Sequence, residues 1–205
     1  MKMLPTICLI FFISTSSAQN VNKILNDADK QYQKSEYLNA SKLYEEALKK
    51  SSMDLTAQYN LGVARFRLNE IEGATEAFKK ALSLSKDKSM SAKIFYNSGV
   101  AFLKSANYPE AITAFRNALK LNSADRDCRE NLQFAINQYK KQLNQKQQNS
   151  GMSPKESKEQ QKSEQKLSKQ AAEKILQSAQ QEESRIRDSL RSKKSSRQNS
   201  ATKNW

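Results

Sequence analysis

The sequence carries one pattern of small and aromatic residues three times. Each copy ends in an Ala-Leu pair, and an aromatic residue stands three positions before that alanine. Small residues stand seven and nineteen positions before the same alanine. The three alanines are 34 and then 37 residues apart, so the period is 34 residues with three extra residues between the second and third copies. The three copies are Ala28, Ala40, Tyr44 and Ala47; Gly62, Ala74, Phe78 and Ala81; and Gly99, Ala111, Phe115 and Ala118.

This pattern predicts pairs of antiparallel helices that stack on one another. Two helices approach closely only where the facing side chains are small, so we place the glycines and alanines at the contacts. We expect the aromatic rings to be buried between neighbouring repeats. Four glycines and three prolines among 205 residues leave little material for tight turns. The sequence therefore predicts an all-α fold, in which the three extra residues around 86–91 form a loop between repeats.

The residues inside the copies resemble tetratricopeptide repeats. The second copy contains Tyr59-Asn60-Leu61-Gly62, and the third contains Phe95-Tyr96-Asn97 followed by Gly99. Together with the alanines and phenylalanines at fixed spacing, these residues follow the family pattern. The resemblance implies a helix-turn-helix solenoid of about three repeats, at residues 21–54, 55–88 and 92–125, that binds other proteins.

The residues after the third repeat predict a capping helix and then a linker. Residues 126–143 have an apolar stripe at helical spacing, and a terminal repeat needs an element with a polar outer side. Residues 144–166 consist mainly of Gln, Lys, Ser, Asn and Glu, a composition typical of a disordered linker. The apolar stripe of the capping helix is Leu132, Ala135, Ile136, Tyr139 and Leu143.

Residues 167–192 predict a second amphipathic helix, and residues 193–205 a basic disordered tail. Such a helix after a linker docks on the parent domain, on a partner helix or on a membrane surface. We favour protein docking, because Glu182 and Glu183 interrupt the face that would meet a membrane. The side chains predicted to contact a partner are Ile175, Leu176, Ile186 and Leu190.

The first eighteen residues have the organisation of a secretory signal peptide. A short positive start is followed by a mostly apolar stretch from Leu4 to Ile13, which is too short to span a bilayer. Ser16 and Ala18 occupy the two positions that a signal peptidase reads, so we expect cleavage before Gln19. The mature protein would then be exported and periplasmic, with Cys128 as its single cysteine and no transmembrane span.

The resemblance also places the first helix of each repeat along a concave groove. The predicted groove combines aromatic side chains with positive charge, which suits a peptide that has apolar anchors and acidic residues. The alternative is that some of these aromatic rings only complete the packing between repeats. The predicted partner-binding residues are Tyr59, Val63, Phe66, Arg67, Lys93, Tyr96, Val100 and Lys104, and the first repeat adds Leu25, Asp29 and Tyr32.

One well-known ligand of the family is a C-terminal carboxylate, which a set of Lys, Asn and Arg side chains clamps. Asn60 and Lys93 fit that set, but Leu25 and Asp29 do not. The resemblance therefore disfavours a chaperone-tail clamp in this chain.

Enzyme chemistry finds little support in the sequence. The chain has no histidine, which removes the commonest general base and metal ligand, and we find no Gly-rich phosphate loop or cysteine cluster. We expect a non-catalytic protein without cofactor, metal or small-molecule substrate. The formal net charge is +14, and residues 144–205 hold 14 Lys and Arg against 7 Asp and Glu. Electrostatic binding of nucleic acid or another anionic surface by this basic tail is the alternative function, although export argues against nucleic acid.

The whole layout also resembles the tetratricopeptide-repeat members of the Bat aerotolerance operons. The matching features are the signal peptide, the repeats, the polar linker, the segment Lys169-Gln170-Ala171-Ala172-Glu173 and the final Asn204-Trp205. This resemblance implies a scaffold in the cell envelope whose partners are other proteins, among them membrane proteins with von Willebrand A domains.

Overall fold

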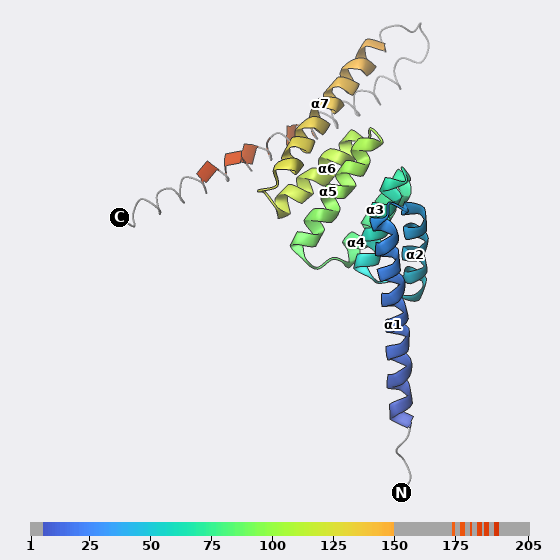
Figure 1. The fold of residues 1–205 in the computed structure, drawn as a ribbon. Coiled ribbons are helices and arrows are strands. Elements are labelled where there is room, and N and C mark those ends of the chain that lie inside the picture. Colours follow the sequence, from blue (N-terminus) through green and yellow to red (C-terminus); the bar gives the residue numbers. More distant parts are fainter. Residues whose placement is uncertain are drawn as a thin grey trace, which may run out of the picture. The chain divides into compact units, whose positions relative to one another are not determined.

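The computed structural model describes residues 6–149 and, beyond them, separate residues between 174 and 192. All elements in this part of the chain are α-helices, as predicted (Figure 1). No helix among the described residues is long and apolar enough to cross a membrane. The helices are α1 (Thr6–Gln33), α2 (Tyr37–Lys50), α3 (Leu55–Arg67), α4 (Ile71–Leu84), α5 (Lys88–Lys104), α6 (Tyr108–Leu121) and α7 (Arg126–Asn149).

The helices form two compact units that divide between Lys86 and Asp87. In the first unit α2 packs on both α1 and α3, and α3 packs on α4. Arg65 on α3 ties the helices together, because it pairs with Glu45 at 2.8 Å and donates to the carbonyl of Gly73 at 3.2 Å. In the second unit α6 packs on both α5 and α7. Within each unit, successive helices therefore pack on one another, as expected of stacked helical pairs.

Helices α3, α5 and α7 begin at aspartates that cap their first turns. Asp54 accepts a hydrogen bond from the Ala57 N–H at 2.8 Å, and Asp87 accepts one from the Met90 N–H at 2.7 Å. Asp125 accepts one from the Cys128 N–H at 2.9 Å. A carboxylate at this position accepts from an otherwise unpaired N–H, and its negative charge interacts favourably with the positive end of the helix dipole. These three aspartates therefore fix where the helices start.

The turn inside each repeat contains one residue with a left-handed backbone conformation, at the same position of the repeat. Ser35, Asn69 and Ala106 have φ of 62°, 66° and 56°, and they are spaced 34 and 37 residues apart like the sequence repeat. The residue after each donates back to a carbonyl in the last turn, for example Glu36 to Gln31 at 2.9 Å. This is the Schellman pattern, in which one left-handed residue ends a helix. The chain makes three such turns without using a glycine.

The extra residues between the second and third repeats differ from the prediction of a loop. The connection is only 85–87, and residues 88–91 form the first turn of α5, which has 17 residues where α3 has 13. Capping by Asp87 sets the start of α5 four residues before the repeat pattern begins. The insertion therefore lengthens a helix.

The small residues lie at helix contacts, as predicted. Gly62 and Gly99 are both buried, and a Cβ at either position would lie 2.6 Å from a ring carbon of Phe78 or Phe115, respectively. Such a distance is far inside van der Waals contact, so only glycine fits beneath each ring. Each phenylalanine thus packs on the first helix of its own repeat, whereas we had expected these rings between repeats. Phe115 also contributes to the core that includes α7.

The helix after the third repeat is confirmed, and it is longer than predicted. Leu132, Ala135 and Ile136 are fully buried against α6, and Tyr139 is nearly so. The helix α7 continues to Asn149, six residues into the stretch predicted as linker. Gln and Lys, which dominate those residues, are good helix formers that extend a helix without needing a packed face. The remaining predicted linker residues, 150–166, lie outside the described part of the chain.

Cys128 is a fully buried core residue, and we predict that its thiol is unreactive in the folded protein. Burial, and secondarily the charge of Asp125, raises the pKa of the thiol from 9.0 to about 12. The thiolate fraction at pH 8 should fall about a thousandfold, so an aromatic disulfide reagent should label Cys128 only after unfolding in guanidinium. Because the unfolded thiol ionises first, this group should lower stability as pH rises from 9.0 towards about 12. Labelling of Cys128 in the native protein at the rate of a free thiol would contradict the burial.

The predicted C-terminal helix is described only in part. Its predicted partner contacts, Ile175, Leu176, Ile186 and Leu190, lie outside the described residues. The described residues between 174 and 192 are helical, and one of them contacts α6. Arg116 on α6 donates from Nη1 to the Ser178 hydroxyl at 3.0 Å. This contact matches one of the three docking modes, in which the segment lies on its parent domain.

Candidate partner-binding pocket

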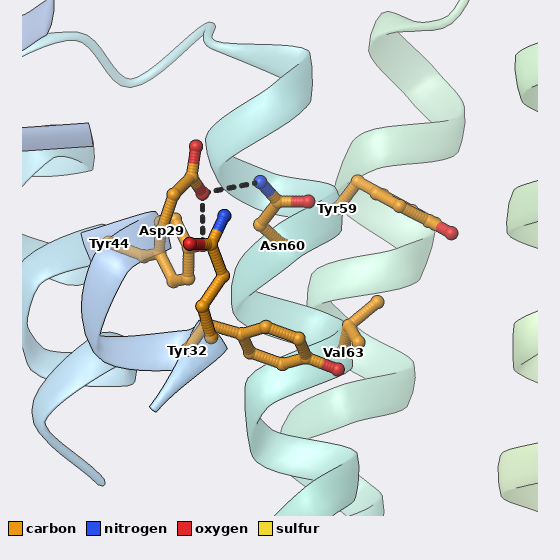
Figure 2. A pocket seen from close by; sticks show the side chains of 7 residues that line it. Asp29, Tyr32, Tyr44, Tyr59, Asn60 and Val63 are labelled. Atoms are coloured by element: carbon orange, nitrogen blue, oxygen red, sulfur yellow. Dashed lines mark hydrogen bonds between the residues drawn. The ribbon is translucent and has the colours of Figure 1, made fainter. Parts of the chain in front are cut away.

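A pocket of about 310 Å³ lies in the first unit, between α1, α2 and α3 (Figure 2). Three tyrosines, two amides, a valine and an aspartate line it. Of these described lining residues, Asp29 is the one that carries a charge. The lining residues are Asp29, Tyr32, Gln33, Tyr44, Tyr59, Asn60 and Val63.

Asp29 is held in place by hydrogen bonds from two other helices. The Tyr44 hydroxyl on α2 and the Asn60 amide on α3 both donate to its Oδ1, the amide at 3.2 Å. Figure 2 shows both bonds converging on this oxygen while the second carboxylate oxygen points away from them. Burial, and secondarily the contact with Asp29, raises the pKa of Tyr44 above its usual value, so its hydroxyl remains a donor. The carboxylate is therefore fixed by the packing of α1, α2 and α3.

The tyrosines around Asp29 are also held by neighbours. The ring of Tyr59 lies 6.0 Å from that of Phe78, and the ring of Tyr32 lies 5.2 Å from that of Tyr37. The hydroxyl of Tyr32 accepts a hydrogen bond from Arg67 Nε at 3.3 Å. Rings fixed in this way lose little conformational entropy when a ligand contacts them. The pocket walls are therefore largely preorganised.

The four groove residues predicted in the first unit divide into two pairs. Tyr59 and Val63 line the pocket, together with Asp29 and Tyr32 from the first repeat. Phe66 is half-buried, and Arg67 is exposed and hydrogen-bonded to Tyr32. The lining residues that we did not place in the groove are Gln33, Tyr44 and Asn60, and Tyr44 had appeared as a core aromatic only.

The four groove residues predicted in the second unit comprise two exposed lysines and two half-buried apolar side chains. Lys93 and Lys104 are exposed, whereas Tyr96 and Val100 pack partly against the core of this unit. The Tyr96 ring lies 6.0 Å from that of Phe115, and its hydroxyl accepts from Asn131 at 3.2 Å. Tyr96 thus has the packing role that was the alternative to partner binding.

Phe134 on α7 was missed by the sequence reasoning. Its side chain is 53% exposed, and it stands 34 residues after Val100, one repeat period away. An exposed phenylalanine in register with a predicted groove position extends the set of candidate contacts onto α7. The repeat spacing contained this signal, because the period continues into the capping helix.

Comparison with known families and structures agrees with this architecture. Two family models, both described as tetratricopeptide repeats, match residues 25–89 and 92–125. No curated protein matches the sequence.

Solved structures with the same fold include the tetratricopeptide domain of Arabidopsis OM64. It has a TM-score of 0.54 and 22% identity, and the match covers 58% of this chain and 96% of that domain. The first such domain of Spaghetti (RPAP3), bound to the HSP90 peptide SRMEEVD, has a TM-score of 0.53 and 19% identity, covering 57% and 90%. The second such domain of human RPAP3, in complex with the HSP70 peptide SGPTIEEVD, has a TM-score of 0.53 and 18% identity, covering 58% and 97%. Residues 25–89 and 92–125 of this chain are therefore tetratricopeptide repeats.

Proposed function

We propose that this protein is a non-catalytic scaffold that binds partner proteins in the cell envelope. The observation that carries the proposal is the pocket on the first unit, whose polar and aromatic lining is held in place before any partner arrives. Proteins with a similar fold bind peptides, as the RPAP3 domains do with their HSP90 and HSP70 peptides. The exposed Phe134 and the predicted C-terminal helix offer further contacts.

The cellular setting of this proposal rests on the sequence. Residues 1–18 have the organisation of a signal peptide, and cleavage before Gln19 would leave α1 to begin close to that residue. The resemblance to the Bat aerotolerance proteins supports a role in a stress-related complex, with von Willebrand A domain membrane proteins among its partners. N-terminal sequencing of the protein from the periplasmic fraction should begin at Gln19. Full-length protein in the cytosol would contradict this setting.

Site-specific crosslinking in intact cells tests the scaffold role. A photoreactive amino acid at Gln33, which is exposed and lines the pocket, should trap one or a few discrete proteins. The matched control is Lys80 on α4, an exposed residue that pairs with Glu76 and lies outside the pocket. The same proteins captured from both positions, or none from Gln33, would contradict the proposal. Capture that disappears on nuclease treatment would favour the nucleic-acid alternative.

A further inference from the structure

The pocket on the first unit carries the opposite charge to the chain as a whole. The protein has a formal net charge of +14, yet Asp29 is the one charged residue among the described residues that line the pocket. The predicted groove combined aromatic rings with Lys and Arg, which favoured acidic ligands. The pocket combines aromatic rings with a carboxylate, so its electrostatic preference is reversed at this point.

The carboxylate of Asp29 has unused capacity to accept hydrogen bonds. Tyr44 and Asn60 both donate to Oδ1, and among the described residues nothing donates to Oδ2. None of the ion pairs between described residues includes Asp29. An ionised carboxylate accepts at about four positions, so this one is incompletely satisfied by the protein.

Arg67 is a cation that contacts the edge of the pocket, because it is hydrogen-bonded to the lining residue Tyr32. It was predicted in the same groove, and it belongs to the same unit. Its Nε donates to the Tyr32 hydroxyl at 3.3 Å, so the guanidinium is anchored on a neighbouring ring. The negative charge of Asp29 therefore remains available to a ligand.

The walls of the pocket suit the stem of a long basic side chain. Tyr32, Tyr59 and Val63 supply apolar surface to the lining of the pocket (Figure 2). Lys and Arg have apolar stems with a charged end, so the stem can pack on these side chains while the end reaches Asp29. Tyrosine faces also attract a nearby cation. A carboxylate ligand would instead place two negative groups together, which is unfavourable.

We propose that the Asp29 pocket binds a lysine or arginine side chain on an extended segment of the partner protein. This rests on the proposed scaffold function and adds the chemistry of the segment that is recognised. The ligand forms a charge-assisted hydrogen bond to the free oxygen of Asp29 and packs its stem between Tyr32 and Tyr59. The site thus recognises a basic residue of the partner, although the overall positive charge of this protein repels basic segments.

A peptide selection tests this specificity directly. The probe is a library of random peptides displayed between constant Gly-Ser segments, selected on the full chain at physiological salt, where long-range attraction is screened. Wild-type protein should enrich Lys or Arg at one position beside an apolar residue. The variant Asp29→Asn keeps the shape and the accepting oxygen but removes the charge, and it should lose this enrichment. The matched control Asp27→Asn removes a charge from the same helix at a partly exposed residue that pairs with Lys30, and this variant should keep the enrichment.

A double-mutant cycle on one selected peptide measures the contact. Replacing the selected basic residue by norleucine should weaken binding to wild-type protein about tenfold or more, and Asp29→Asn should do the same to the unchanged peptide. Combining the two changes should weaken binding no further than either alone. Circular dichroism of the Asp29→Asn variant should show an unchanged helix content.

The outcomes separate this inference from the proposed function. If wild-type protein enriches peptides without Lys or Arg, or if Asp29→Asn keeps the same enrichment, the scaffold role stands and the basic-residue inference fails. If no peptide is enriched and crosslinking from Gln33 traps nothing, both fail. If enrichment appears only after Lys193, Lys194 and Arg197 are changed to serine, the occupant is the chain's own tail, and the assignment to a partner is overturned.

Discussion

Replacing Phe115 with alanine should lower the free energy of unfolding of the second unit by about 3–5 kcal/mol. The ring is fully buried, it lies on Gly99, and it joins the core that α6 shares with α7. Deleting it removes buried apolar surface and leaves a cavity lined by α5, α6 and α7. Domains are stable by only about 5–15 kcal/mol, so the loss is a large part of the total. Denaturant unfolding followed by circular dichroism measures it.

The control for Phe115 is another phenylalanine of the same unit. Phe134 is 53% exposed, so Phe134→Ala should change stability by no more than about 0.5 kcal/mol.

The contact between Phe115 and Gly99 can be tested as well. Gly99→Ala places a methyl group 2.6 Å from the ring and should destabilise the wild-type protein, but its effect should become small or favourable once Phe115 is alanine. Equal effects of the two phenylalanine variants would show that the ring is not in the core.

The helical pairs could be predicted because their cause is local and periodic. A close helix contact requires a small residue at a fixed place, so Gly62 and Gly99 were visible from spacing alone, whereas the packing of Phe78 and Phe115 on these glycines was not predicted. Helix ends were less predictable, because they depend on single capping side chains. Asp87 sets the start of α5, and nothing in the period of 34 residues shows that the insertion would be helical.

The pocket could be predicted only in part, because it depends on distances between side chains of different helices. Tyr59 and Val63 were placed by the repeat register, but the convergence of Tyr44 and Asn60 on Asp29 joins three helices. A count of the charged residues in the predicted groove therefore did not indicate the sign of the charge in this pocket. Arg67 contributed a positive charge to that count, but its Nε donates a hydrogen bond to the Tyr32 hydroxyl. Asp29 is the charged residue that lines the pocket.

Replacing Leu132 with alanine should lower the free energy of unfolding of the second unit by about 2–5 kcal/mol, although this residue lies outside the three repeats. Leu132 on α7 is fully buried in the same core as Phe115 and Ile136. In a repeat stack the last pair has no following repeat to cover it, so the capping helix supplies the missing half of its core. Hydrogen exchange should therefore speed up in α6 as well as in α7.

The matched control is Leu121, which ends α6 and is 36% exposed. Leu121→Ala removes the same atoms from the same unit but leaves no closed cavity, so we expect a loss below about 1 kcal/mol. If the two leucine variants had equal unfolding midpoints, α7 would be a peripheral helix, and the repeats would have to be stable without it. If Leu132→Ala destabilises the unit and Leu121→Ala does not, α7 is an integral part of the fold, and the exposed Phe134 is held on a rigid helix where it can serve a partner.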